Sequence, residues 1–321
     1  MNPKFQPADL NSVSTYSIKD RKTKVQQTDF AQLGPPDATL AQFTATLPDI
    51  LKVKDLRNIV KAIAHAYKLE KPVIVGMGGH VIKCGLSPLF IHLMEIGLVS
   101  AVIMNGGASI HDFEIATIGS TSEDVAVNLE TGMFGMVQET PKWMNYAISA
   151  GAHADIGMGA ALGNTLLEMN PPHMNYSILA SGARLGIPVC VHVAIGADTI
   201  HMHPSVDSAA IGKTSFTDFR ILVSVLKHIG EGGVYLNIGS AVVLPEVFVK
   251  ALNLARNLSK GEIKNFTTVN MDMIQHYRPL ENVVKRPTQS GGAGYTLTGH
   301  HEIMVPLLVH LVLAELAIDE G

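Results

Sequence analysis

Hydrophobic runs that end in glycine alternate along the chain with segments of helical periodicity. Residues 54–68 (KDLRNIVKAIAHAYK) space their aliphatic side chains so that they fall on one face of a helix. Residues 71–80 (KPVIVGMGGH) form a short β-branched run that ends in glycines, which is typical of a buried parallel strand and its exit loop. The pattern therefore predicts a helix followed by a buried strand.

The same alternation continues through most of the chain. It predicts a helix at 86–97, a strand and glycine loop at 100–109, a helix from near Ile110, a strand at 186–198, a helix at 216–230 and a strand at 232–243. Such repetition predicts an α/β fold whose parallel sheet is covered by helices on both faces. Right-handed crossovers then bring the glycine loops to the carboxyl edge of the sheet, where open α/β sheets bind ligands.

Residues 1–40 differ from the rest because they are polar and show no periodicity. We expect them to form an N-terminal arm, whose basic run at 20–24 contacts either an anionic partner or a neighbouring subunit. No low-complexity linker divides the remainder, so we expect residues 41–321 to form a single domain.

Composition narrows the class of protein. Of 321 residues, 47% are hydrophobic and only 16% are charged, which indicates a deep core, surface buried between subunits, or both. A net charge of −4 argues against a nucleic-acid binder. No apolar run is long enough to span a membrane, the N-terminal segment has no secretory h-region, and two cysteines imply no disulfide framework. We therefore expect a cytoplasmic enzyme that binds neither nucleic acid nor membrane.

Four glycine-rich segments are the candidate ligand loops. They lie at 76–80, 105–108, 237–241 and 289–294. Glycine lets the backbone turn with positive φ and approach a ligand closely, although each loop alone fits an ordinary tight turn. None is a G-x-G-x-x-G dinucleotide fingerprint. The fourth follows no clear strand, so we interpret it as a linker, with a lid as the alternative.

Taken together and in this order, these segments resemble the deoxyhypusine synthase family. GMGGHVIKCGLSPLFIHLMEIGLVSAVIMNGGASIHDF is similar to the family's first strand, cofactor loop, long helix and second strand, LGIPVCVHVAIGAD to a later strand, and GHHEIMVPLLVHLVLAEL to its closing strand and helix. The resemblance runs from about residue 50 to the end. It implies a Rossmann-like fold that binds NAD.

The resemblance also implies substrate, assembly and cofactor contacts. The family takes a butylamine unit from spermidine through an enzyme lysine imine, so the expected substrate is an amine or polyamine-like molecule. A homotetramer is expected, since the family builds its site across subunit interfaces. The implied cofactor-binding residues are Gly78, Gly79, His80, Asn105, Gly106, Gly107, His111, Gly239, Ser240, Ser290 and His301.

The catalytic positions depart from the family. Its Trp-Gly-Lys is Lys285, Arg286 and Pro287 here, so a proline stands at the imine-forming position. Its Lys-His pair is Leu244 and Pro245, and neither residue transfers protons. We therefore expect an NAD-dependent transferase or oxidoreductase of this type that does not make deoxyhypusine.

Three residues are the candidates for catalysis. Glu281 matches an acidic residue that faces the polyamine in the family. Lys285 would form an imine if burial or the neighbouring Arg286 kept it neutral, and its alternative role is a solvated surface charge. His300, at a predicted loop edge, is the candidate acid or base.

Fourteen histidines in 321 residues raise a second hypothesis. A cluster of histidines with Asp112, Asp198 or Glu302 would bind zinc or a similar metal, giving a metal-dependent hydrolase or lyase on the same scaffold. The histidines that motivate this hypothesis are His111, His201, His203, His300 and His301. None of the spacings is a recognised metal motif, so we assign no metal ligand. Loss of the family's lysine and histidine leaves a third hypothesis, a non-catalytic oligomeric homologue.

Overall fold

The computed structural model describes residues 3–319. Contacts divide the chain into two units, Met1–Val53 and Lys54–Gly321, and we describe each by itself. The described part of the first unit contains three single 3₁₀ turns, Leu10–Ser12, Ile18–Asp20 and Gln27–Asp29, and the helix α1, Leu40–Ala45. None of its described residues is fully buried. The division into an arm and a single domain at residue 40 stays a prediction.

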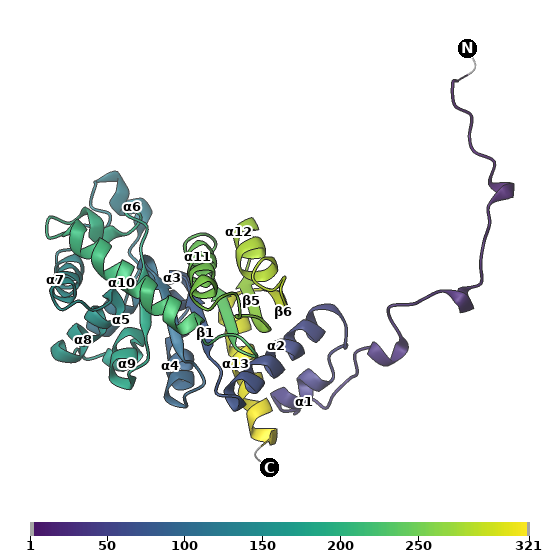
Figure 1. The fold of residues 1–321 in the computed structure, drawn as a ribbon, viewed down its shortest axis with the longest axis horizontal. Coiled ribbons are helices and arrows are strands. Elements are labelled where there is room, and N and C mark those ends of the chain that lie inside the picture. The colour runs from purple at the N-terminus through teal and green to yellow at the C-terminus, as the bar shows by residue number, and fades with distance from the viewer. Residues whose placement is uncertain (1–2, 320–321) are drawn as a thin grey trace. The chain divides into compact units, whose positions relative to one another are not determined.

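The second unit contains a parallel sheet and its helices (Figure 1). The strands are β1 (Val73–Met77), β2 (Ala101–Asn105), β3 (Val189–His192), β4 (Val234–Ile238), β5 (Phe266–Asp272) and β6 (Gly292–Thr298). The helices are α2 (Leu51–Lys68, which begins in the first unit), α3 (Gly79–Lys83), α4 (Ser87–Glu95), α5 (Gly106–Ile118), α6 (Val125–Glu130), α7 (Glu139–His153), α8 (Met158–Met169), α9 (Ile178–Leu185), α10 (Ser208–Leu226), α11 (Val243–Leu258), α12 (Tyr277–Pro279) and α13 (His301–Asp319). Two 3₁₀ helices, Met174–Tyr176 and Thr199–Met202, and a π-helix, Leu280–Lys285, complete the list.

The strands form one sheet in the order β3-β2-β1-β4-β5-β6, and all neighbours are parallel. The chain starts at the centre with β1, runs outward to β3, and then returns to β4 and runs outward to β6. The direction of winding therefore reverses between β1 and β4, which makes this the topological switch point of a Rossmann-like sheet. The predicted α/β fold with a parallel sheet is confirmed.

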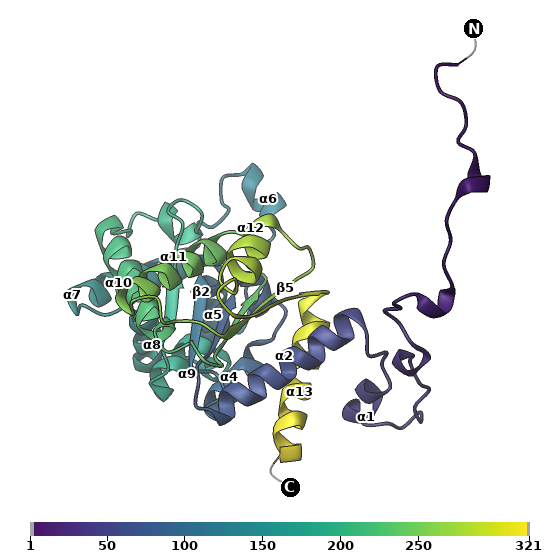
Figure 2. The same ribbon diagram turned by 45° about the vertical axis from the view of Figure 1, so that its right-hand side comes forward.

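Alternate residues of the strands pack into two separate hydrophobic layers. Val73, Val75 and Met77 join the layer of α2, α4, α9 and α13, whereas Ile74 joins the layer of α10 and α11. Figure 2 shows the strands between α10 and α11 on one side and α4 and α9 on the other. A sheet covered on both faces needs apolar residues at nearly every strand position, which accounts for the low charge of the chain.

The second glycine loop is a helix start instead of a loop. We expected a helix from near Ile110, but α5 begins at Gly106. The reason is a helix cap, because the side-chain oxygen of Asn105 accepts a hydrogen bond from the Ala108 N–H at 2.8 Å. The strand therefore passes directly into the helix.

The fourth glycine segment is not a linker. Its last residues enter β6, which begins at Gly292 and pairs with β5 from Phe266 onward. Neither strand was predicted. Gly291 and Gly292 have φ of 116° and 98°, a conformation that favours glycine, so these glycines serve the entry into an edge strand.

Two fully buried aspartates hold helix ends in the core. Asp112 on α5 accepts hydrogen bonds from the Ser177 hydroxyl and from the N–H groups of Ile178 and Leu179 at the start of α9. Asp218 on α10 accepts hydrogen bonds from N–H groups at the start of α8 and in β3. Burial raises the pKa of Asp112 to about 6 and that of Asp218 to about 7. Both carboxyl groups are structural.

Among the helices of residues 3–319, none combines the length and the apolar character that crossing a membrane requires.

The raised pKa of Asp218 predicts a pH-dependent contribution to stability. The folded chain keeps this proton up to about pH 7, whereas the unfolded chain releases it near 3.8, so stability falls as pH rises between these values. Asp218→Asn removes that dependence. The unfolding free energy of the wild type relative to the variant should be higher at pH 5 than at pH 8 by about 1–3 kcal/mol.

Urea unfolding at the two pH values measures this difference. The buried histidines titrate in both proteins, so they cancel in the comparison. An equal difference at pH 5 and pH 8 contradicts the assignment.

Candidate functional site

The switch point between β1 and β4 is closed by direct backbone contact. The Gly78 N–H donates to the Ile238 carbonyl at 2.9 Å, and a Cβ on Gly78 would lie 2.1 Å from the Gly239 carbonyl oxygen. Gly239 has φ of 66°, and a Cβ there would lie 2.7 Å from His301 Nε2. These glycines are therefore required for close packing of two loops and a histidine ring.

His301 fills the space above this junction. Its side chain is 1% exposed, its Nε2 lies 3.9 Å from Asp272 Oδ1, and its ring meets the His80 ring edge-on with centroids 5.9 Å apart. Burial lowers the pKa of His301, and the Asp272 carboxylate acts in the opposite direction. The structure thus brings together four of the predicted residues, Gly78, His80, Gly239 and His301.

A cavity of about 590 Å³ lies beside the start of α5. Its walls come from α3, α5 and the segments at 118–125, 134–137 and 197–199. The titratable residues among those that line it are His111, Glu114, Glu123, Asp198 and Lys83. Three carboxylates against one lysine make this cavity acidic.

Asp198 is the least satisfied acid in the cavity wall. Its side chain is 9% exposed, and its Oδ2 has no hydrogen-bond partner. The His201 Nε2, which also lacks a partner, lies 4.0 Å away. Burial raises the pKa of Asp198 to about 6. Since buried polar atoms normally have partners, this oxygen is suited to accept a hydrogen bond from a ligand.

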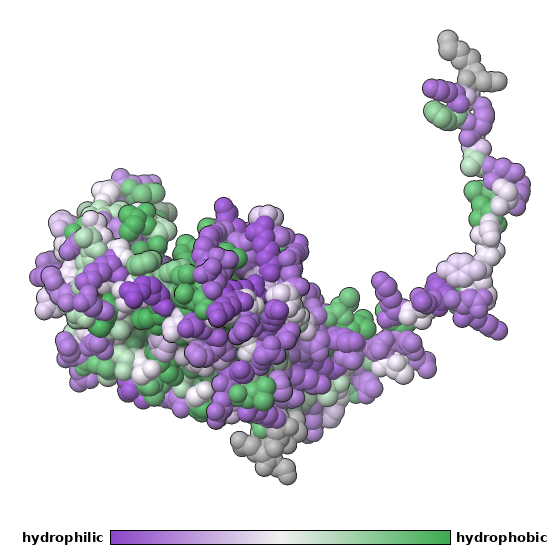
Figure 3. Space-filling model, in the orientation of Figure 1, coloured by the Kyte–Doolittle hydropathy of each residue, from purple (hydrophilic) through white to green (hydrophobic). Residues whose placement is uncertain are grey.

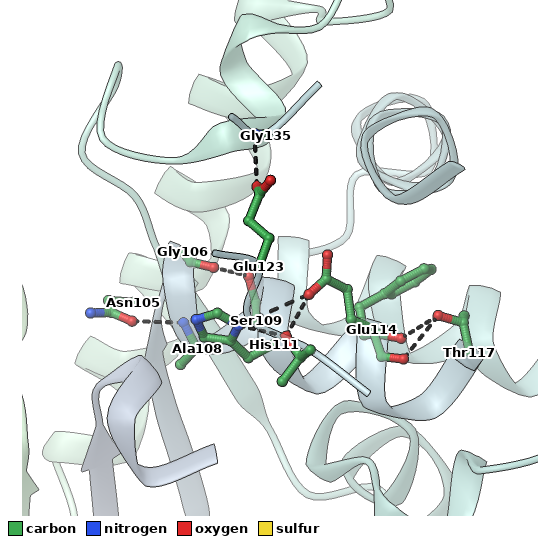
Figure 4. Close-up of polar contacts among 11 residues, drawn as sticks. Asn105, Gly106, Ala108, Ser109, His111, Glu114, Thr117, Glu123 and Gly135 are labelled. Atoms are coloured by element: carbon green, nitrogen blue, oxygen red, sulfur yellow. Dashed lines mark hydrogen bonds and ion pairs between the residues drawn. The ribbon is translucent and has the colours of Figure 1, made fainter. Parts of the chain in front are cut away.

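A chain of hydrogen bonds orients His111 at the cavity wall. Its Nδ1 lies 2.7 Å from the Thr121 hydroxyl, which donates to Glu114 Oε2 at 2.5 Å. Figure 4 shows His111 and Glu114 projecting from α5 toward each other, with Glu123 reaching the Gly135 N–H above them. Burial, with a smaller contribution from Lys83, lowers the pKa of His111 to about 4. The imidazole is therefore neutral at pH 7.

Of the remaining cofactor candidates, some lie at the cavity and others have structural roles. Gly107 lines the cavity, and Gly79 packs against the His111 ring. Asn105 is committed to capping α5. Ser240 is buried, and its hydroxyl accepts a hydrogen bond from the Leu244 N–H at the start of α11.

Lys285 and Glu281 lie on the connection from β5 to β6. They form an ion pair of 2.7 Å on the π-helix, and the Lys285 side chain is 60% exposed. Hydrogen bonding to Lys285 lowers the pKa of Glu281. An exposed, paired ammonium is the opposite of the desolvated lysine that imine chemistry requires. Of the two roles considered for Lys285, the structure supports the solvated surface charge.

The structure separates Ser290 from the other cofactor candidates. Ser290 precedes β6 and accepts a hydrogen bond from Arg256, so it lies at the amino edge of the sheet. His300 lies at the carboxyl edge before α13, but it is 64% exposed and 3.8 Å from Glu302. Parallel pairing of β5 and β6 places the two ends of β6 at opposite edges.

The metal hypothesis gains no support from the geometry. Within residues 3–319, no three histidine, cysteine, aspartate or glutamate side chains are arranged to hold a metal ion. Asp112, a proposed ligand, instead caps α9 in the core. The Asp198 and His201 pair lacks a third ligand.

The sequence interpretation missed most of the cavity wall. Lys83, Glu114, Thr121 and Glu123 were not singled out. One signal was available, since the segment between α5 and α7 holds only the short helix α6 and interrupts the alternation of strand and helix. Long connections of this kind are often functional.

Two adjacent glycines of α5 offer a matched test of the packing around Asp198. A Cβ on Gly106 would lie 1.9 Å from Asp198 Oδ2, whereas a Cβ on Gly107 has no neighbour closer than 3.8 Å. We expect Gly106→Ala to destabilise the fold by about 1–3 kcal/mol because it displaces the carboxylate. Gly107→Ala should be neutral or stabilising by up to about 1 kcal/mol. Equal urea midpoints for the two variants would contradict this packing.

Several solved structures are similar to this chain. A conserved candidate LOR/SDH protein from Methanococcus maripaludis S2 matches over 90% of this chain and 75% of its own, with 15% identity and a TM-score of 0.50. AgrE, in a ternary complex with ornithine and NAD⁺, matches over 82% and 33%, with 13% identity and a TM-score of 0.49. A candidate deoxyhypusine synthase from Entamoeba histolytica matches over 87% and 94%, with 11% identity and a TM-score of 0.45.

These likenesses concern the fold. This chain spans about a third of the length of AgrE and of ArgZ, an arginine dihydrolase from the ornithine–ammonia cycle in cyanobacteria. No protein-family model and no curated protein matches the sequence. At 15% identity, the similarity to the LOR/SDH protein shows that the two chains share a Rossmann-like α/β fold.

Proposed function

We propose that the protein is an NAD-dependent enzyme that acts on a small amine in the cavity beside α5. The observation that carries the proposal is an acidic cavity at the carboxyl edge of a sheet with the order β3-β2-β1-β4-β5-β6. That edge is where sheets of this order bind dinucleotides.

The residues of the cavity fit parts of NAD. The free oxygen of Asp198 accepts hydroxyl groups such as those of a ribose. The Lys83 ammonium at the rim and the backbone of Gly107 are suited to phosphate oxygens. When bound, NAD⁺ supplies a hydride acceptor.

The acidic wall favours a cationic substrate. Glu123 holds its own loop through the Gly135 N–H and the Asn128 amide, both at 2.7 Å, and Glu114 accepts from Thr121. The cavity is lined by three carboxylates and one lysine. An ammonium ion bound there would balance the excess negative charge.

We propose further that the reaction does not proceed through an imine on Lys285. The proline at the family's lysine position and the solvent exposure of Lys285 both support this view. Transfer or oxidation of an amine directly in the cavity is the alternative that the geometry favours over deoxyhypusine formation.

Assembly into a homotetramer is also a proposal. Val127, Leu129 and Met133 on and after α6 are 63%, 64% and 57% exposed, which is unusual for apolar side chains so close together. Figure 3 shows hydrophobic surface over this region. Light scattering of the purified chain tests the proposal, and a monomeric mass overturns it.

Calorimetric titration with NAD⁺ tests the cofactor proposal. We expect saturable binding that Asp198→Asn weakens about tenfold, since one hydrogen bond from a ligand to a charged acceptor is lost. Glu262→Gln is the matched control, because Glu262 is exposed and lies away from the cavity. Absence of binding at millimolar NAD⁺ rejects the cofactor.

The amine proposal has a separate readout. Diamines and polyamines should reduce NAD⁺ in the presence of the wild type. If NAD⁺ binds and carboxylic acids or neutral alcohols are the only compounds turned over, the substrate class is wrong while the cofactor stands.

A further inference from the structure

The direction of each hydrogen bond around His111 follows from chemistry. Glu114 as a carboxylate only accepts, so the Thr121 hydroxyl gives its single proton to Glu114. Thr121 must then accept from His111, and Nδ1 of the neutral imidazole carries the proton. The lone pair is therefore on Nε2.

Thr121 is needed because the acid cannot reach the ring by itself. Glu114 Oε2 lies 4.0 Å from His111 Nδ1, which is too long for a hydrogen bond. The hydroxyl bridges this gap with two short hydrogen bonds of 2.7 and 2.5 Å. The three residues thus form a continuous chain from acid to hydroxyl to imidazole.

The backbone around Thr121 is shaped to deliver it to this position. α5 ends at Gly119 with φ of 72°, and the chain turns back over its last turns. Ser122 also has φ of 72°, an uncommon conformation for a residue with a side chain. Glu123 then anchors the segment through Gly135 and Asn128. Strained conformations of this kind are retained where the surrounding structure requires them.

The unbonded nitrogen belongs to a ring that forms part of the cavity wall. His111 is only partly exposed and lines the cavity. Its Cδ2, the carbon bonded to Nε2, lies so close to Gly79 that a Cβ added there would be 3.0 Å away. Lys83 also lines the cavity and opposes a positive charge on the ring. The nitrogen is thus available to a ligand in its unprotonated form.

We propose that Glu114 and Thr121 are positioning residues that fix the tautomer of His111 and make its Nε2 the proton acceptor of this cavity. The inference rests on the proposed function for its substrate, an amine. In the step, the Nε2 lone pair takes one proton from the substrate ammonium, and the amine nitrogen keeps the electron pair of the broken N–H bond. The imidazolium that forms is stabilised by Glu114 through Thr121.

Nitrogen NMR of the isotope-labelled full chain tests the tautomer without any ligand. We expect His111 to be protonated on Nδ1 in the wild type and in Thr121→Ser, which keeps the hydroxyl. Thr121→Val should lose this preference. Thr121→Ala provides a second variant without the hydroxyl in case valine perturbs folding.

His203 is an internal control for the same spectra. The Ser205 N–H donates to His203 Nδ1 at 3.1 Å, so this nitrogen is an acceptor and also accepts from the Ser205 hydroxyl at 2.7 Å. The neutral ring therefore carries its proton on Nε2. It should report the opposite tautomer in every variant. A wild-type His111 protonated on Nε2, or a tautomer unchanged in Thr121→Val and Thr121→Ala, overturns the inference.

Kinetics separate this inference from the proposed function. With an amine substrate, Thr121→Val should lower kcat about tenfold or more and alter the pH profile, whereas Thr121→Ser restores both. Failure of NAD⁺ to bind rejects the proposed function and leaves the tautomer result intact. NAD⁺-dependent turnover with identical pH profiles in wild type and Thr121→Val rejects the role of the hydrogen-bonded Glu114, Thr121 and His111 and leaves the proposed function intact.

Discussion

Burial of both faces of a six-stranded parallel sheet is the constraint on which the rest of this structure depends. Most side chains of the strands pack into two apolar layers, so the faces of the sheet are closed to a ligand. Polar groups that bind or react must then lie beyond the strand ends. The order of the strands brings the ends of β1, β2 and β4 together at one edge, and the acidic cavity lies beside the helix that follows β2.

The acids of this chain serve two different purposes that burial alone does not distinguish. Both oxygens of the buried Asp112 accept hydrogen bonds at the start of α9, and Oδ2 of the buried Asp218 accepts them from N–H groups of α8 and β3. These carboxyl groups therefore hold the core together. Asp198 is almost as buried but has an oxygen without a partner. Hydrogen-bond satisfaction, and not the raised pKa that all three share, separates structural acids from a candidate ligand contact.

The parallel sheet could be predicted from the sequence, because its first four strands are apolar runs bounded by glycine or proline. The last two strands were missed for a physical reason. β5 reads FTTVNMD and buries polar side chains, among them Thr268 and Asn270, whose Oδ1 accepts a hydrogen bond from the Asn237 amide. β6 is a half-exposed edge strand. Neither has the composition of a strand buried on both faces.

The candidate site was predicted less well because glycine is ambiguous in a sequence. Gly78, Gly106 and Gly239 do lie at the predicted edge, yet each admits another part of the protein instead of an empty space for a ligand. The cavity is lined by a segment after α5 whose path depends on Gly119, Ser122 and a carboxylate anchored across the loop. Tertiary contacts of this kind leave no periodic pattern.

Charge balance explains why a neutral histidine stands among these carboxylates. A protonated His111 would compete with a cationic ligand for the same negative wall, whereas a neutral ring leaves that charge for the ligand. Burial and, to a smaller extent, Lys83 lower the pKa of the ring and keep it neutral. Thr121 separates the ring from direct contact with Glu114, which would favour its protonation. The acid therefore acts on the ring through a hydroxyl, which sets its tautomer while the imidazole stays ready to accept a proton.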